Sequence, residues 1–169
     1  TDIVIPDSVT TIGEGAFGRN NLTSVAIGNS VTTIGGFAFK NNQLTTVEIP
    51  DSVTFIGQDA FEDNQLTSVI IPGSITSISE SAFEGNMLTS INIPNSITYL
   101  GEDAFQYNQL TSVSIPESVI TIAENLQLIR NHAESVVKGM GKKDLKNMVG
   151  YNFRMGEIES AIGVAQLKK

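Results

Sequence analysis

Apolar and polar positions recur with a period of 22 residues along the first two thirds of the chain. Alanine–phenylalanine pairs, asparagines, leucines and prolines all keep this step. The pairs begin at Ala16, Ala38, Ala60, Ala82 and Ala104, and the asparagines are Asn20, Asn42, Asn64, Asn86 and Asn108. The leucines are Leu22, Leu44, Leu66, Leu88 and Leu110, and the prolines are Pro6, Pro50, Pro72, Pro94 and Pro116, with Gly28 in the second slot. Four columns in phase predict a repeat solenoid.

The unit at residues 44–65 shows which elements the pattern predicts. Its first six residues fit L-x-x-L-x-L, which indicates a short strand with alternate side chains on one face. Pro50 ends this strand because it has no N–H to donate. Residues 53–57 predict a second short extended piece and a turn. Ala60 and Phe61 predict a single helical or 3₁₀ turn that places Phe61 in the interior.

No unit of this kind buries its apolar face alone, so the stacked coils bury one another. We expect the apolar columns to form continuous ridges. The asparagine column is expected to satisfy turn backbone groups of its own and the next coil.

The unit L-T-S-V-x-I-P-x-S-V-T-x-I-G-x-x-A-F-x-x-N-x resembles the BspA-like, Treponema-type leucine-rich repeat common on bacterial surfaces. The resemblance covers residues 3–119. It implies a right-handed leucine-rich-repeat arc of five coils within residues 1–119, with β and 3₁₀ segments and a parallel sheet on the concave side. It also implies adhesion or protein binding, and no catalysis.

Positions three and five of each predicted strand point outward. Position three reads Ser24, Thr46, Ser68, Ser90 and Ser112, and position five reads Ala26, Glu48, Ile70, Asn92 and Ser114. The second column varies while the core columns do not, which fits a binding surface and, more simply, an idle solvent face. Neither column holds a large aromatic residue of the kind that dominates tight interfaces.

A threonine column runs through Thr23, Thr45, Thr67, Thr89 and Thr111. Flat threonine arrays can bind ice or crystalline polymers. The simpler interpretation is that threonine favours strands and lines the start of each coil.

After Val119 the repeat pattern fails. Residues 120–169 predict a helical segment with helices at 123–137 and 157–168, because apolar residues recur there at three- and four-residue steps. Two amphipathic helices could cover the last coil, since repeat arrays need caps. Deleting residues 124–169 is then expected to cause aggregation or a lower melting temperature.

This segment also carries motifs of its own. Leu128-Ile129-Arg130-Asn131-His132, Gly150-Tyr151-Asn152-Phe153-Arg154-Met155 and the run from Glu157 to Gly163 resemble the DegT/DnrJ/StrS sugar aminotransferases, which use pyridoxal phosphate. In that family the asparagine matching Asn152 reaches the cofactor phosphate of the neighbouring subunit. Gly156 stands where the family commonly has threonine, a better helix N-cap.

The aminotransferase resemblance does not predict an enzyme. The family's Schiff-base lysine lies upstream of the Arg-Asn-His segment, where this chain has repeats. Without it we expect no bound cofactor, and Asn152 and Arg154 are interpreted as vestigial. His132, the only histidine, makes no metal site or catalytic triad alone.

Composition and charge refine this picture. Residues 1–119 carry a net charge of −11 and residues 120–169 one of +3, which suggests two segments of different history. An acidic repeat region argues against nucleic-acid binding.

The absence of cysteine excludes disulfides and thiolate sites. No apolar run is long enough to span a membrane, and the chain starts in mid-pattern without a signal peptide, as a piece of something longer would.

Three interpretations follow. The first is a non-catalytic scaffold, extracellular or on a bacterial cell surface, that binds protein or glycan and self-associates through uncapped solenoid ends. The second is a recombined product carrying an inactive aminotransferase remnant. The third is a purely structural array.

Overall fold

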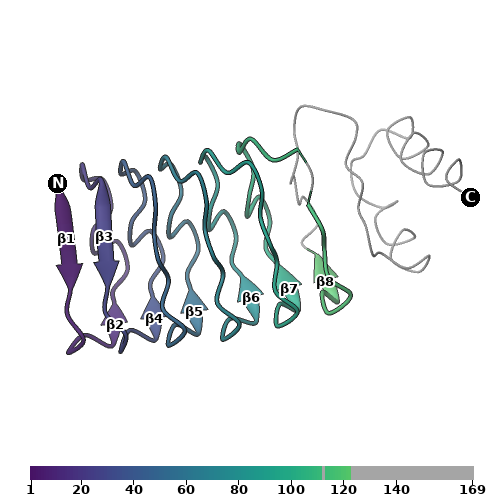
Figure 1. The fold of residues 1–169 in the computed structure, drawn as a ribbon, viewed down its shortest axis with the longest axis horizontal. Coiled ribbons are helices and arrows are strands. Elements are labelled where there is room, and N and C mark those ends of the chain that lie inside the picture. Colours follow the sequence, from purple (N-terminus) through teal and green to yellow (C-terminus); the bar gives the residue numbers. More distant parts are fainter. Residues whose placement is uncertain (112, 123–169) are drawn as a thin grey trace, which may run out of the picture.

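The computed structural model describes residues 1–111 and 113–122. The chain winds through coils that stack side by side from the N-terminus onward (Figure 1). We number the coils from each leucine of the repeat, so that the first to fifth span residues 1–21, 22–43, 44–65, 66–87 and 88–109, and a sixth starts at 110. The helices and the cap predicted from residue 123 onward lie outside the described residues.

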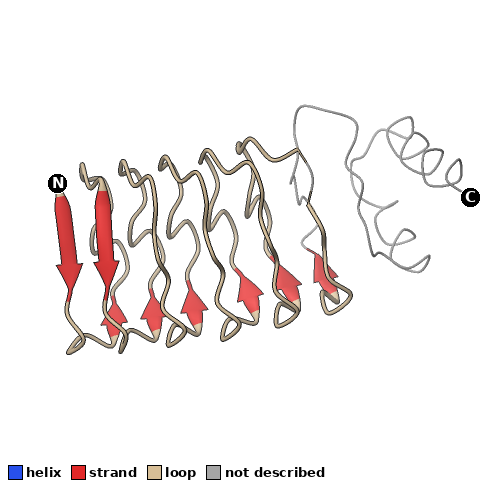
Figure 2. Ribbon diagram, in the orientation of Figure 1, coloured by secondary structure: helices blue, strands red, loops and turns tan. Residues whose placement is uncertain are grey.

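Within residues 1–111 and 113–122 all strand pairing is parallel, and it falls into three small sheets. Strands β1 (Asp2–Ile5) and β3 (Ser24–Ile27) form the first. The second holds β2 (Thr11–Ile12), β4 (Thr33–Ile34) and β5 (Phe55–Ile56). The third holds β6 (Ser77–Ile78), β7 (Tyr99–Leu100) and β8 (Thr121–Ile122). Figure 2 shows the short strands following one another along one side of the stack, as the second extended piece of the repeat predicts.

The predicted L-x-x-L-x-L strand is paired as a strand only in the first two coils, apart from a single bridge between Asn92 and Ser114. Gly28 explains the difference. A Cβ atom built on Gly28 would lie 2.8 Å from the carbonyl oxygen of Ile5, so the two coils approach each other closely because no side chain intervenes. The later coils carry proline in this slot, which brings a ring and has no N–H to donate.

A ladder of phenylalanine rings runs through the core. Ring centroids of Phe17, Phe39, Phe61, Phe83 and Phe105 follow one another at 5.4, 5.3, 5.5 and 5.7 Å, with planes within 12° of parallel. The last four are fully buried, and most members of the leucine, valine and isoleucine columns are buried with them. The predicted core columns are therefore confirmed. Each buried ring contributes about 3 kcal/mol of hydrophobic stabilisation.

The asparagine column ties each coil to the one before it. The Asn64 side-chain amide donates to Phe39 O at 2.9 Å and to Phe61 O at 3.2 Å, and its oxygen accepts from Leu44 N at 3.1 Å. Asn42 and Asn86 repeat these contacts. The predicted structural role is confirmed, but the prediction of the next coil as partner is wrong. Besides the carbonyl of Phe61 in its own coil, the Asn64 amide reaches the carbonyl of Phe39 in the preceding coil. The amide closes its own turn and therefore points back toward the N-terminal end of the stack.

The segment around each Ala-Phe pair is a succession of tight turns rather than a helical or 3₁₀ turn. Two residues per coil adopt a left-handed conformation, as Asp59 (φ 55°) and Asp63 (φ 54°) do in the third coil. Positive φ interrupts helical geometry, so only isolated bonds such as Glu62 N to Asp59 O remain. The handedness of the arc and the concave placement of the sheet stay predictions.

Candidate binding faces

Residues at positions three and five of each L-x-x-L-x-L segment form the leucine-strand face. The predicted residues Ser24, Ala26, Thr46, Glu48, Ser68, Ile70, Ser90, Asn92 and Ser114 are all exposed on it. Ser112 lies outside the described residues. The register pairs Ser24 with Asp2 and Ala26 with Val4, so the first coil adds two residues that the sequence analysis omitted. Ile70 and Val4 are the most exposed apolar members, at 81 % and 74 %.

The first coil starts this face with a charged hydrogen-bond cluster. The Asp2 carboxylate accepts from Ser24 Oγ at 2.8 Å and from Thr23 Oγ1 at 3.1 Å. These two hydrogen bonds hold the pKa of Asp2 below its ordinary value. Thr23 belongs to the predicted threonine column, whose members are all exposed.

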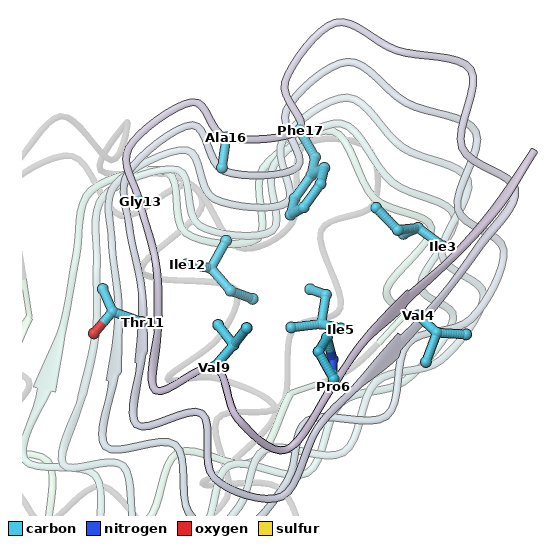
Figure 3. A pocket seen from close by; sticks show the side chains of 10 residues that line it. All are labelled: Ile3, Val4, Ile5, Pro6, Val9, Thr11, Ile12, Gly13, Ala16 and Phe17. Carbon is cyan, nitrogen blue, oxygen red and sulfur yellow. The ribbon is translucent and has the colours of Figure 1, made fainter.

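A second exposed surface lies on the short strands. We call the outward residues of β2 and of β4 to β7, with the threonines that precede them, the short-strand face. In the first coil Val4 and Thr11 point away from the interior on opposite sides, which places the two faces on opposite sides of the coil (Figure 3). The short-strand face holds Phe55 and Tyr99, exposed by 48 % and 39 %. The sequence analysis missed it, although two aromatic residues in an otherwise hydroxyl-bearing column were a visible signal.

The third side of the coil, formed by the turns, holds most of the acidic residues. Lys40 of the second coil lies between two carboxylates of the third, 2.9 Å from Asp59 Oδ2 and in direct contact with Glu62 Oε2. Burial and the neighbouring Asp59 raise the pKa of Glu62 to about 7 despite the opposing effect of Lys40. Burial lowers the pKa of Lys40, but its hydrogen bonds to Glu62 and Asp59 outweigh this and raise it.

A hollow of about 220 Å³ opens inside the first coil, lined by Ile3, Ile5, Val9, Ile12 and Phe17 (Figure 3). The same positions in the later coils pack against the preceding coil, and Phe17 is partly exposed where Phe39 is fully buried. The hollow is thus the apolar end of the stack, without the convergent polar groups that orient a small ligand.

Nothing in residues 1–111 and 113–122 brings three metal-ligating side chains together, and no helix within these residues is long and apolar enough to cross a membrane. The motif residues Asn152 and Arg154 lie outside this part of the chain.

Similarity to known proteins divides the chain in the same way as its charge. A model of the DegT/DnrJ/EryC1/StrS aminotransferase family matches residues 120–169. No curated protein sequence matches the chain.

Solved structures of leucine-rich repeat proteins resemble the chain, two of them as follows. One is a leucine-rich repeat protein from Bacteroides ovatus, 25% identical with a TM-score of 0.49, and 75% of this chain aligns with 46% of that one. The other is a leucine rich cell surface protein from Faecalibacterium prausnitzii, 22% identical with a TM-score of 0.40, over 88% of this chain and 62% of that one. The chain therefore spans less than two thirds of either.

The family of the repeat part follows from a more extensive match. A model of the BspA type leucine rich repeat region matches residues 1–110 in six copies, in agreement with the parallel coils and the buried columns. The chain belongs to the BspA-type leucine-rich repeat family.

Proposed function

We propose that the repeat array is a non-catalytic scaffold at a bacterial cell surface that binds a protein or glycan ligand through the leucine-strand face. One observation carries the proposal. At position five the exposed residue changes from Glu48 to Ile70 to Asn92 in successive coils, while the residues packed beneath remain valine, leucine or isoleucine. A fixed scaffold with a variable exposed column provides recognition without altering the fold.

The test is to charge this face. Ser68→Lys combined with Asn92→Lys adds two positive charges in adjacent coils. The matched control is Gln65→Lys with Gln109→Lys, which adds the same charge at exposed positions of the turns. Binding to an array of immobilised glycans and extracellular-matrix proteins is expected to fall at least tenfold for the first pair only. Equal binding by both pairs would remove the leucine-strand face as the site.

The apolar end of the first coil supports self-association as a second mode of interaction, since contiguous exposed apolar surface marks interaction sites. Ile5→Lys would place a charge in this hollow. Sedimentation velocity should then show the variant as a smaller species than the wild type; identical profiles would argue against this mode.

The family match over residues 120–169 supports an alternative, that this segment is the inactive remnant of an aminotransferase. The Schiff-base lysine of that family has no counterpart upstream of Arg130, where the repeats stand. Incubation with pyridoxal phosphate and borohydride is expected to trap no lysine adduct, and a stoichiometric adduct on one lysine would show that cofactor binding persists.

A further inference from the structure

The short-strand face carries two exposed aromatic rings in one column. Phe55 begins β5 and Tyr99 begins β7. Phe55 and Tyr99 occupy the same position of the repeat two coils apart, and Ser77 occupies that position in the coil between them. The registers Thr33↔Phe55 and Tyr99↔Thr121 show that the rings replace hydroxyl side chains of the column. Single exposed apolar residues are ordinary, but two in one column form a platform.

The separation of the rings follows from the stacking of the coils. The core rings of the third, fourth and fifth coils follow one another at 5.5 and 5.7 Å. Two coils therefore place Phe55 and Tyr99 about 11 Å apart, although β5 and β6 are not paired as strands. This is about the length of one disaccharide unit in an extended β-1,4-linked polysaccharide, whose sugar rings present flat apolar faces.

The charge of this face restricts its ligand. Residues 52–57, 74–79 and 96–101 contain no charged side chain, although the repeat part carries −11. Carboxylates border each stretch at one end, with Asp51 before the first, Glu80 after the second and Glu102 after the third. A neutral strip bordered by carboxylates is complementary to an uncharged ligand and repels polyanions.

Hydroxyl groups beside the rings supply the polar contacts. Thr54 Oγ1 donates to Thr32 O and Thr98 Oγ1 donates to Thr76 O, each at 3.2 Å. Both side chains are exposed, and their protons are directed to the preceding coil. The remaining lone pairs are hydrogen-bond acceptors for the hydroxyl groups of a sugar.

From these features we propose that the short-strand face binds an extended, uncharged β-1,4-linked polysaccharide, with Phe55 and Tyr99 stacked on sugar rings two residues apart. Tyrosine suits such a role because its ring is rigid and its hydroxyl remains in water. This site lies opposite the leucine-strand face and goes beyond the function proposed for that face.

The experiment uses the 169-residue chain and isothermal titration calorimetry with four hexasaccharides. Cellohexaose and chitohexaose are the neutral β-1,4-linked ligands, maltohexaose is the α-linked comparison, and the hyaluronan hexasaccharide is the anionic one. Only the first two are expected to bind. Phe55→Ala and Tyr99→Ala should each weaken the association roughly 3- to 10-fold. Ile70→Ala, an equally apolar truncation on the leucine-strand face, should leave it unchanged.

A second pair of variants tests the spacing at constant composition. Phe55→Thr with Thr33→Phe moves one ring by a coil and places the two rings about 16 Å apart. This variant is expected to bind cellohexaose as weakly as Phe55→Thr alone does. Both rings are present, but their separation no longer matches the length of one disaccharide unit. Affinity equal to that of the wild type would show that ring number, not spacing, matters.

The outcomes separate this proposal from the previous one. No binding of either neutral ligand by the wild type, stronger binding of the hyaluronan hexasaccharide, or wild-type affinity in the alanine variants would each overturn the polysaccharide site. The Ser68→Lys, Asn92→Lys variant should retain cellohexaose binding, because its charges lie on the opposite face. Loss of cellohexaose binding in that variant alone would reassign the glycan to the leucine-strand face.

Discussion

Two neighbouring interfaces between coils share their core but differ in the hydrogen bonds of the short strands. Between the second and third coils, Gly57 N donates to Ile34 O at 2.8 Å and Thr54 N donates to Thr32 O at 2.9 Å. Lys40 adds an ion pair across the same interface. Between the third and fourth coils these two ladder bonds are not made by the equivalent residues, and β5 and β6 belong to separate sheets.

The serine at position 79 explains the difference. In the first, second, third and fifth coils this slot holds Gly13, Gly35, Gly57 and Gly101. A Cβ atom on Gly57 would lie 2.7 Å from the carbonyl carbon of Gly35, which is too close for a real side chain. Ser79 therefore holds its coil away from the ladder, and its hydroxyl donates to Ile56 O at 2.5 Å instead.

What the two interfaces share is the phenylalanine ladder, the asparagine amide and the backbone bonds of the turns, such as Phe39 N to Ala60 O and its equivalent Phe61 N to Ala82 O. Phe39 and Phe61 are 5.3 Å apart across the first interface, and Phe61 and Phe83 are 5.5 Å apart across the second. The array thus tolerates the loss of two short-strand bonds and of its lysine ion pair, provided that the core column, the buried amides and the turn bonds continue.

The largest effect on stability is expected from a substitution in the phenylalanine ladder, which both interfaces share. Phe61→Ala removes the ring common to both interfaces and should lower the free energy of unfolding by about 3–5 kcal/mol, because it leaves a cavity in a fully buried column. Urea denaturation followed by circular dichroism measures it. Phe37→Ala, which truncates a partly exposed ring, is the control and should cost far less. A loss below about 1 kcal/mol in Phe61→Ala would mean that the backbone ladder, not the core, dominates.

The next largest effect is expected from a substitution that disturbs the short-strand ladder between the second and third coils. Gly57→Ala forces a methyl group against the backbone of the second coil and should destabilise the protein by about 1–3 kcal/mol. Gly73→Ala is the matched control, since a Cβ atom there meets nothing within 4 Å. Its stability should be unchanged or slightly higher. Equal effects of the two alanines in thermal unfolding would contradict the close-packing explanation.

The sequence predicts the columns better than the contacts between them. A buried column such as that of Phe61 is visible because burial tolerates few residue types, and the 22-residue step aligns five copies of it. The exposed position of Ile70 or Asn92 follows from the alternation of a strand. These parts of the fold and of the leucine-strand face need only local geometry.

What the sequence did not predict depends on the distance between coils. Gly28 and Ser79 each decide whether one ladder forms, yet each is a single departure from its column. The backward direction of the Asn64 amide and the positive φ of Asp59 are fixed only when the coils are stacked. The short-strand face was missed for the same reason, since Phe55 and Tyr99 become neighbours only through two turns of the solenoid.

A smaller effect on stability is expected from restoring the short-strand ladder between the third and fourth coils. Ser79→Gly removes the side chain that separates the third and fourth coils and should allow the ladder to close, although glycine costs about 0.5–1 kcal/mol in conformational entropy. We expect a net change within about 1 kcal/mol of the wild type. Amide hydrogen exchange should detect the repair directly, as greater protection at position 79 and at Thr76. Unchanged protection would mean that another contact keeps the two coils apart.

The smallest effect is expected in the pH dependence of stability, through Glu62 at the interface between the second and third coils. The pKa of Glu62 is raised to about 7 in the folded protein, so between about pH 4.5 and pH 7 the folded state binds more protons at this site than the unfolded state. Stability at this site therefore falls as the pH rises through that window. Glu62→Gln should flatten the slope of melting temperature against pH there, while Glu48→Gln, on the exposed leucine-strand face, should keep it. The raised pKa of Glu84, caused mainly by burial, leaves a residual slope of the same sign in both variants. If Glu62→Gln kept the full slope, Lys40 would hold Glu62 ionised throughout, and the ion pair would stabilise the interface between the second and third coils at every pH in the window.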